Sequence, residues 1–475
     1  MLWVFIAVLI SKSMSLLTQF FLGYVLSVED FGVFAVITGL MALVSGFQDP
    51  GLGRLLVQKQ NKFEKLFPLA LLISLCFAVV GSITLLVFSS FMGSDSNENN
   101  LFNLVIFISV TLPFMSLSSI FKAKLNIDLR FKDVSKIDTY NAIGYGLILM
   151  AFAYFGARAY SFIFAIVFTY IFNFVSYWYL SEIRVINKPN FKYFSEIWSG
   201  IKWLFIGAFL LGAALRGDYL VLENIFTEEE LGYYFFGFML TANIGMLLSQ
   251  GIQSVLMPSF SSIDDDKRVL NGFNRASAAL VFLTGILCLG MVVFSPYLIS
   301  YIWNGKWDSA ILVAVVMAIS LPLKMLSPLG GALLESKGKW RDRTIFLFID
   351  AATLIMSAYL GGSYFGLDGA AYAVAIQRGT LGLSLYFKAA KELNYTFIKT
   401  LSSVMSMYIP FGIVAFIFFY FNLVDLTMVK SSDFFRLCVI GVLSLFVYIL
   451  LNLLFNKVGV AETIDVLKKL KKKTA

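Results

Sequence analysis

The sequence contains no histidine, and this absence removes several classes of chemistry. Without histidine the 475-residue chain has no His-based catalytic triad, no HExxH zinc site and no histidine proton relay. The three cysteines, Cys76, Cys288 and Cys438, stand in apolar runs, and none belongs to a CxxC pair. No GxxxxGK[ST] motif occurs, so energy for transport has to come from a gradient or a partner. Hydrolytic and zinc enzymes are therefore disfavoured, and no catalytic or metal-binding residue is expected.

Charge is also scarce, whereas long apolar runs are abundant. Only 14% of the residues are charged and 59% are hydrophobic, with a mean hydropathy of +0.82. A spanning helix needs about 20 apolar residues, and such runs follow one another along the whole chain. The sequence therefore predicts an all-α polytopic membrane protein with about fourteen transmembrane helices. The predicted spans are Leu2–Leu26, Phe31–Gln58, Leu66–Phe91, Leu101–Phe121, Ile137–Phe155, Tyr160–Leu180, Ile201–Leu222, Leu231–Val255, Val269–Tyr301, Ala310–Leu334, Thr344–Leu360, Gly366–Phe387, Phe397–Phe421 and Phe434–Phe455.

Basic residues fall unevenly among the loops between these spans. One set of alternate loops and the tail hold most of the 37 Lys and Arg residues, and the opposite loops hold only Arg158, Lys306 and Lys430. Because basic loops are retained in the cytoplasm, both termini are predicted to be cytoplasmic and the number of spans even. The net charge of +8 then follows from topology and needs no nucleic acid. The lysine-rich segment Lys468–Lys473 predicts an anchor on anionic lipid of the inner leaflet.

Two pairs of turns predict an internal repeat. Ser27–Phe34 and Thr227–Tyr234 both read as capping boxes followed by glycine, and they lie 200 residues apart. Tyr154–Gly156 and Tyr364–Gly366 share the sequence Tyr-Phe-Gly at a spacing of 210 residues. Since each interval contains six predicted spans, an even number, the two halves should have the same orientation in the membrane.

The repeat defines the predicted domain organisation. We expect two six-helix lobes in parallel repeat around a central cavity, followed by two extra helices. The predicted parts are an N-lobe at 1–181, a cytoplasmic linker at 182–200, a C-lobe at 201–391, additional helices at 392–456 and a basic cytoplasmic tail at 457–475.

Six short segments resemble a known family. They are Phe21–Ala35 and Asp49–Lys59 in the first half, and Gly217–Val221, Glu230–Tyr234, Met257–Ser261 and Phe365–Tyr372 in the second. In this order they are similar to bacterial polysaccharide transporters, the O-antigen and exopolysaccharide flippases of the multidrug/oligosaccharidyl-lipid/polysaccharide exporter superfamily. The resemblance implies transport of an undecaprenyl-diphosphate-linked oligosaccharide from the inner to the outer leaflet. Family members commonly have a basic residue where Tyr24 stands here, so the role of that residue cannot be transferred.

A few basic residues lie inside the predicted spans. Lys12, Lys324 and Arg378 stand near the middle of their helices, and Arg216 stands in the outer third of its own. Placing an ion at the centre of a spanning helix costs at least about 2.5 kcal/mol, so such residues usually face a cavity or a partner. We expect these four to bind the diphosphate of the cargo in the central cavity, with arginine offering two donors and lysine a point charge. Aromatic and hydroxyl side chains such as Tyr24, Tyr140 and Tyr372 would contact the glycan.

Two acidic residues and one helix break complete the candidate site. Asp350 and Asp218 lie within spans, and Asp350 is near the middle of its helix. Asp350 is either one half of an ion pair with Lys324 or Arg378, or a site where a proton or sodium ion drives transport. No other cofactor is expected. Asp49, Pro50 and Gly51 interrupt the second span, either as a hinge for alternating access or as a simple irregularity at a helix end.

The predicted function is that of a flippase for O-antigen, capsule or exopolysaccharide synthesis in the bacterial cytoplasmic membrane. Expected partners are the lipid-linked oligosaccharide, membrane lipid and polysaccharide polymerase machinery. Alternatives left open are a peptidoglycan lipid-precursor flippase, a cation-coupled multidrug antiporter, a membrane glycosyltransferase or polymerase, and a structural scaffold. The outward loops around Asp95 and Asp425 are short, which disfavours an enzyme with an extracytoplasmic domain.

Overall fold

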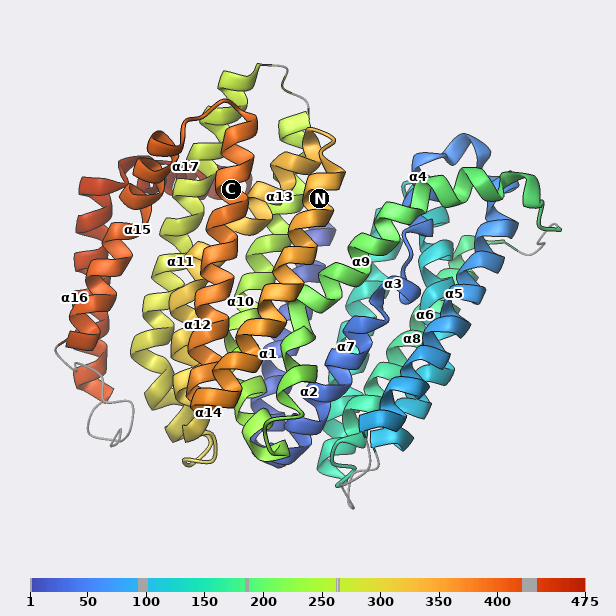
Figure 1. Ribbon diagram of the computed structural model, residues 1–475, viewed down its shortest axis with the longest axis horizontal. Helices are drawn as coiled ribbons and strands as arrows, with labels where there is room; N and C mark the ends of the chain where they lie inside the picture. Colours follow the sequence, from blue (N-terminus) through green and yellow to red (C-terminus); the bar gives the residue numbers. More distant parts are fainter. Residues whose placement is uncertain are drawn as a thin grey trace. The chain divides into compact units, whose positions relative to one another are not determined.

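A computed structural model describes residues 2–92, 101–183, 188–261, 263, 265–420 and 434–474 of the chain. All regular elements in these ranges are helices, and no strand occurs among them, in agreement with the predicted all-α class. The outward loops at Asp95 and Asp425 lie outside the described residues. By packing, the chain forms two compact units, Met1–Gly232 and Tyr233–Ala475. Figure 1 shows the helices coloured in chain order.

The first unit holds nine complete helices, two short 3-10 helices and the first turn of a tenth helix among its described residues. They are α1 (Leu2–Val25), α2 (Val28–Leu43), α3 (Ser45–Gln48), α4 (Leu52–Gln58), η1 (Gln60–Lys62), α5 (Phe63–Met92), α6 (Leu101–Ile127), α7 (Phe131–Tyr154), α8 (Tyr160–Ser181), η2 (Phe191–Tyr193), α9 (Phe194–Leu222) and the start of α10 (Glu228–Ser261).

The second unit holds the rest of α10 and the helices that follow it. They are α11 (Asp266–Ile302), η3 (Asp308–Ala310), α12 (Ile311–Lys324), α13 (Leu326–Ser336), α14 (Trp340–Glu392), α15 (Phe397–Tyr420), α16 (Phe434–Phe455) and α17 (Lys457–Thr474).

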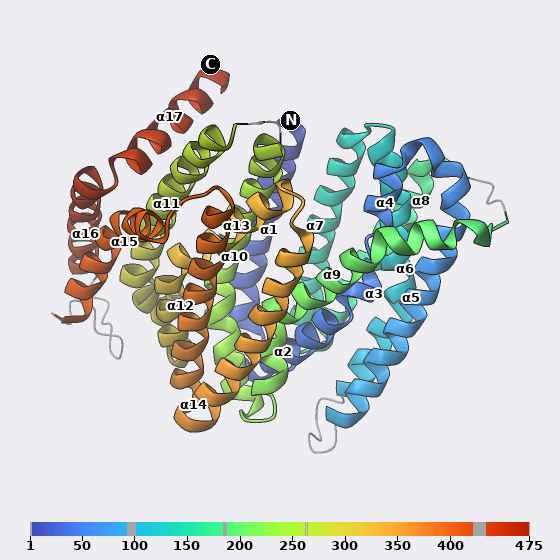
Figure 2. The same cartoon turned by 45° about the horizontal axis from the view of Figure 1, so that its top comes forward.

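Within the described residues, each predicted span consists mostly of helix. Nine helices of the described part are long and apolar enough to cross a membrane, which identifies a multi-pass membrane protein. The fourteen crossings are compatible with this result, but their number stays a prediction. The boundary between the packed units falls at Gly232, so α9 packs with the first unit, beside α3 and α4 (Figures 1 and 2). The predicted C-lobe begins at residue 201 because that boundary was drawn from the sequence repeat and not from packing. It stays a prediction.

Two predicted spans are interrupted. The second is divided into α2, α3 and α4, and Gly51 takes the left-handed φ of +85° at the break. There the Gly51 backbone N–H donates to the Asp49 carboxylate at 3.2 Å. The tenth span is divided into α12 and α13, which meet at Met325, three residues after Pro322. Pro328 lacks the N–H that would donate to the Lys324 carbonyl in a continuous helix, which accounts for the break between these two residues.

In both Tyr-Phe-Gly segments the glycine has a positive φ. Gly156 ends the turn after α7 with φ +80°, and Gly366 reverses the direction of α14 with φ +65° and ψ −153°. The second conformation is essentially restricted to glycine. The aromatic residues before both glycines are exposed, as is typical of side chains at a membrane surface. Because of Gly366, α14 is a hairpin of two helical limbs (Figure 1).

The two capping boxes are confirmed, and they pack against each other within the first unit. The Ser27 hydroxyl accepts from the Asp30 N–H, and the Thr227 hydroxyl accepts from the Glu230 N–H. A Cβ on Gly32 would lie 1.9 Å from the Glu228 carbonyl oxygen, and a Cβ on Gly232 would lie 2.1 Å from the Val28 carbonyl oxygen. The contact is therefore reciprocal, since each glycine meets the backbone at the start of the other helix. The two glycines occupy equivalent positions in the predicted repeat. Only glycine permits backbones to approach this closely.

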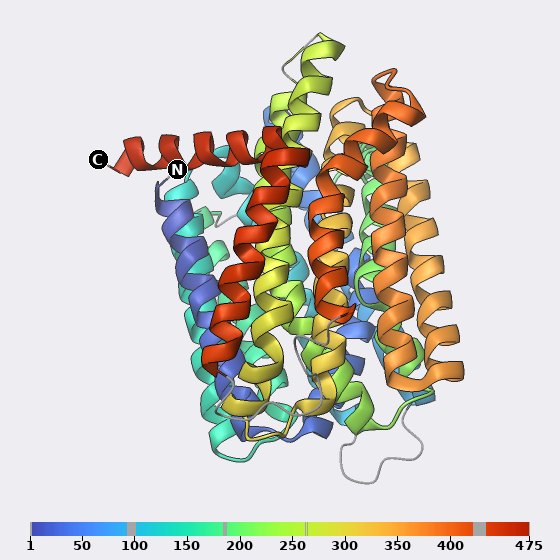
Figure 3. The ribbon, with the colours of Figure 1, turned by 90° about the vertical axis from the view of Figure 1, so that its left-hand side faces the viewer.

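The lysine-rich tail belongs to α17, which packs across α11. Figure 3 shows α17 turning sharply away from α16. Asn456, between these two helices, donates from its side chain to the Ala278 carbonyl of α11 at 3.2 Å. Glu462 of α17 forms an ion pair with Arg275 of α11. These contacts hold α17 across α11.

Candidate functional site

Arg216 lines a cavity in the first unit. The cavity has a volume of about 330 Å³ and lies between α2, α3, α7, α8 and α9. Arg216 is its one charged lining residue among the described residues, and Thr38, Ser45 and Tyr145 add hydroxyl groups. A guanidinium with hydroxyl groups around it can donate hydrogen bonds to an anion such as a phosphate.

Close packing of α9 on α2 and α3 fixes one wall of this cavity. A Cβ on Gly212 would lie 2.1 Å from the Ala42 carbonyl oxygen, so the two backbones touch. The Ser45 hydroxyl is 2.8 Å from that carbonyl and 3.0 Å from the carbonyl of Ala208, to which it can also donate. Arg216 stands one turn beyond Gly212 on α9 and is thereby held at the cavity.

The structure brings two other predicted cations together in the second unit. The Lys324 ammonium lies 5.4 Å from the centroid of the Phe238 ring, and the Arg378 guanidinium carbon lies 4.8 Å from it. Lys324 ends α12, Arg378 is on the second limb of α14, and Phe238 is on α10. Arg378 is only 6% exposed. Both cations are thus within the range of a cation–π interaction with one aromatic ring.

Glycines explain why these two cations meet. A Cβ on Gly382 would lie 2.3 Å from the Leu323 carbonyl oxygen and 3.0 Å from the Lys324 Cα. Gly382 is one helical turn beyond Arg378, on the same side of the limb. The second limb of α14 therefore contacts the end of α12 directly. This contact brings Arg378 and Lys324 to the same ring.

Asp350 has a different partner from the one considered in the sequence. The Gln377 amide donates to its carboxylate at 2.9 Å, to its carbonyl at 3.2 Å and to the Thr353 hydroxyl at 3.0 Å. Among the described residues Asp350 forms no ion pair with Lys324 or Arg378. An uncharged amide satisfies the carboxylate instead, across the two limbs of α14. Gln377 was missed in the sequence because an amide in an apolar run carries no charge signal.

The remaining candidates belong to the first unit. Asp218 is fully buried on α9, two residues after Arg216, and Lys12 is partly buried on α1. Asp49, Pro50 and Gly51 form the break between α3 and α4, as described above, and the Gly51 Cα faces Leu204 of α9. Whether this break acts as a hinge stays a prediction. No grouping of three His, Cys, Asp or Glu residues suited to a metal occurs in the described part.

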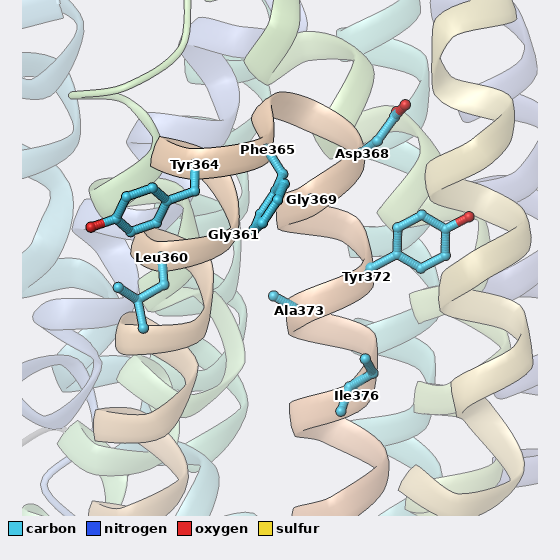
Figure 4. A pocket seen from close by; sticks show the side chains of 9 residues that line it. All are labelled: Leu360, Gly361, Tyr364, Phe365, Asp368, Gly369, Tyr372, Ala373 and Ile376. Carbon is cyan, nitrogen blue, oxygen red and sulfur yellow. The ribbon is translucent and has the colours of Figure 1, made fainter.

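A second cavity lies at the tip of the α14 hairpin. It has a volume of about 620 Å³ and an almost entirely apolar lining. Figure 4 shows Phe365 between the limbs, with Tyr364 and Tyr372 on their outer sides. Tyr372, expected to contact the glycan, therefore lines this cavity, six residues before Arg378. Tyr24 and Tyr140, the other two tyrosines of that prediction, are exposed residues of the first unit.

Charged residues at the predicted inner ends of the helices form ion pairs between neighbouring segments. Lys59 and Lys62 both contact Glu196, at 2.7 and 3.0 Å. Arg130, in the turn between α6 and α7, donates to Asp133, and this hydrogen bond raises the pKa of the guanidinium further. These ion pairs connect neighbouring segments at one end of the helices.

The long apolar helices of the described residues define a multi-pass membrane protein. A family model described as "polysaccharide biosynthesis protein" matches residues 21–312, more than half of the chain. The chain belongs to this family, and the resemblance noted in its sequence is confirmed.

Individual relatives agree with this assignment. The chain is 22% identical over 413 residues to an uncharacterized membrane protein in the cps region of Klebsiella pneumoniae, covering 82% of this chain and 81% of that protein. It is 20% identical over 416 residues to the lipopolysaccharide biosynthesis protein WzxC of Escherichia coli (strain K12), covering 86% and 83%. The fold is similar to that of the lipid II flippase MurJ in an inward closed conformation, with a TM-score of 0.71 at 14% identity, covering 94% and 98%.

Proposed function

We propose that the protein is a flippase that moves an undecaprenyl-diphosphate-linked oligosaccharide from the inner to the outer leaflet of the bacterial cytoplasmic membrane. The observation that carries this proposal is the pair Lys324 and Arg378, two cations inside membrane-crossing helices that meet at Phe238. A diphosphate cannot enter hydrocarbon unaided, and fixed positive charge at that depth offers it a favourable environment. Membership of a polysaccharide biosynthesis family supports an oligosaccharide as the rest of the cargo.

The mechanism we propose is alternating access without covalent chemistry. Lys12, Arg216, Lys324 and Arg378 would each bind the diphosphate during transport. The break at Asp49–Gly51 would supply the hinge. Asp350 would sense a proton or sodium gradient, because binding of a cation to its carboxylate would change the hydrogen bond from Gln377. Both termini would face the cytoplasm, and a polysaccharide polymerase would use the product outside.

The proposal is tested by translocation in proteoliposomes. An undecaprenyl-diphosphate-linked oligosaccharide with a fluorescent label on the glycan is placed in the inner leaflet, and its appearance outside is read with an impermeant quencher. We expect a rate well above that of protein-free vesicles. Peptidoglycan lipid precursor serves as the second cargo, because the fold likeness to a lipid II flippase makes it the nearest alternative. Faster transport of that precursor would assign the protein to peptidoglycan synthesis instead.

The lysines of α17 are expected to hold this helix on anionic lipid. Each lysine near such a surface contributes about 1 kcal/mol, so replacing Lys468, Lys469, Lys471, Lys472 and Lys473 with glutamine should release the end of the helix. The measurement uses an environment-sensitive label at Ile464→Cys, an exposed position of α17, in a background without the native cysteines. In nanodiscs, adding phosphatidylglycerol should shift its emission to shorter wavelength with the native tail and leave it unchanged with the glutamine tail.

A label at Tyr301→Cys, an exposed position at the end of α11, is the matched control and should not respond to the tail substitutions. Equal shifts at position 464 with both tails would contradict a role for the lysines.

A further inference from the structure

The apolar cavity at the tip of the α14 hairpin has one charged residue, Asp368, among the described residues that line it. Asp368 is exposed and stands two residues after Gly366, in the first turn of the second limb. The helix dipole favours a negative charge in a first turn. Among the described residues the Asp368 carboxylate forms no ion pair and no side-chain hydrogen bond, so its charge is available to a cation from outside the protein.

Small residues of the two limbs create the space of this cavity. A Cβ on Gly361 would lie 2.5 Å from the Gly369 carbonyl oxygen and 2.8 Å from the Ala373 Cβ. The limbs therefore touch at their glycines, and no large side chain stands at the point of contact. Figure 4 shows Phe365 between the limbs and Ile376 further along the second limb. The cavity thus begins beside the exposed Asp368 and continues along apolar side chains.

The length of the cavity matches the depth of one membrane leaflet. Eight residues separate Asp368 from Ile376, which corresponds to about 12 Å along the limb. One leaflet contributes about 15 Å, half of the hydrocarbon core. In the predicted topology this turn faces the outside, and the exposed rings of Tyr364 and Phe365 are typical of a membrane surface. A lipid with its headgroup at Asp368 can therefore place an acyl chain along the cavity.

The carboxylate decides which lipid is favoured. Lipid tails are as apolar as the lining, so the lining alone does not prefer one phospholipid over another. A carboxylate attracts an ammonium headgroup and repels an anionic one such as phosphatidylglycerol. A primary ammonium can also donate charge-assisted hydrogen bonds to the carboxylate, whereas a quaternary ammonium has no N–H to donate. The order expected from this chemistry is phosphatidylethanolamine, then phosphatidylcholine, then phosphatidylglycerol.

The predicted repeat supplies a contrasting turn in the first unit. The residue 210 positions before Asp368 is Arg158, which follows the first Tyr-Phe-Gly segment as Asp368 follows the second. Arg158 forms an ion pair with the almost fully buried carboxylate of Asp30, at 3.5 Å. The two corresponding turns therefore carry opposite charges, and only the turn of α14 presents a carboxylate to the lipid.

We infer that the tip of the α14 hairpin binds phosphatidylethanolamine, with the primary ammonium at Asp368 and an acyl chain in the apolar cavity. This lipid is not the transported cargo, so the inference goes beyond the proposed function and does not depend on it. The bound lipid would contact both limbs of the hairpin, because residues of both limbs line the cavity.

Photocrosslinking from inside the cavity tests the inference. The full-length protein carries p-benzoylphenylalanine at position 365 and is placed in nanodiscs with equal amounts of phosphatidylethanolamine and phosphatidylglycerol. After illumination, mass spectrometry identifies the attached lipids. We expect phosphatidylethanolamine to exceed phosphatidylglycerol by about two- to five-fold. The matched control is the same label at position 155, the exposed phenylalanine of the first Tyr-Phe-Gly segment, which should show no such excess.

Two substitutions then isolate the carboxylate. With the label at position 365, Asp368→Asn should lower the lipid ratio to that at position 155, and Asp368→Glu should retain the excess. Both variants change an exposed side chain, so the melting temperature should stay unchanged. Equal attachment of the two lipids at position 365 would overturn the inference. An excess of phosphatidylethanolamine that persists in Asp368→Asn, or that also occurs at position 155, would overturn it as well.

Discussion

Replacing Arg378 with glutamine is expected to lower the rate of lipid-linked oligosaccharide translocation by about ten- to a hundred-fold. A hydrogen bond to a charged group contributes about 1.5 to 3 kcal/mol, which corresponds to this range if the bond is made to the diphosphate during crossing. Lys324→Gln should lower the rate too, since both cations lie within 5.4 Å of the same ring centroid. The rate is measured in proteoliposomes at matched protein content.

Two further variants separate loss of charge from loss of structure. Arg378→Lys keeps the charge but removes the paired donors of the guanidinium, so its rate should be intermediate. Lys306→Gln is the matched control, because Lys306 also lies near an aromatic ring, that of Trp307 at 5.6 Å, but in a turn after α11. Its rate should equal that of the unsubstituted protein. Unchanged rates for both Arg378→Gln and Lys324→Gln would contradict the basic-site account.

Substitution of Gly232 or Gly32 by alanine is expected to destabilise the protein strongly. In each variant the new Cβ would lie about 2 Å from a backbone carbonyl oxygen, which cannot move as a flexible side chain can. Overpacking of this kind costs about 1 to 3 kcal/mol and sometimes more, so each variant should melt several degrees lower or fail to fold. The measurement is the melting temperature in detergent, followed by size-exclusion chromatography of the heated protein.

Gly207→Ala is the control for this pair. Gly207 lies in α9, and a Cβ built there meets no atom within 4 Å. Alanine is favoured over glycine in a helix by about 0.5 to 1 kcal/mol, so this variant should melt at the same temperature or slightly higher. If Gly32→Ala and Gly232→Ala melted like Gly207→Ala, the close contact of α2 with the first turn of α10 would be wrong.

Local signals in the sequence predicted most of the helices and their turns. The capping boxes at Ser27 and Thr227 depend on residues three positions apart, so no tertiary information is needed to identify them. The glycines of the Tyr-Phe-Gly segments permit the positive φ that both turns have. Hydropathy located the spans because each must match the bilayer by itself. The breaks at Gly51 and Met325 were harder to predict from hydropathy, because apolar residues continue on both sides of each break.

The candidate site was only partly predictable, because its arrangement depends on contacts between distant helices. Their position in the middle of predicted spans identified Lys324 and Arg378. Burying a charge there costs free energy, so such residues usually face a cavity or a partner. This charge signal could not identify Phe238, which is one of 49 phenylalanines, or Gln377, which carries no charge. It also suggested an ion pair for Asp350, whereas the hairpin of α14 brings Gln377 to that carboxylate. Which helix faces meet is decided by glycine contacts such as that of Gly382.

The central claim is that this membrane protein moves a diphosphate-linked oligosaccharide and that cations within its spans make the crossing possible. The most direct measurement compares translocation of the undecaprenyl-diphosphate-linked oligosaccharide by the unsubstituted protein, by Arg378→Gln and by protein-free vesicles. The account predicts rapid transport by the unsubstituted protein and a loss of at least about ten-fold in the variant. Transport no faster than in protein-free vesicles, in preparations that are folded and correctly inserted, would contradict it.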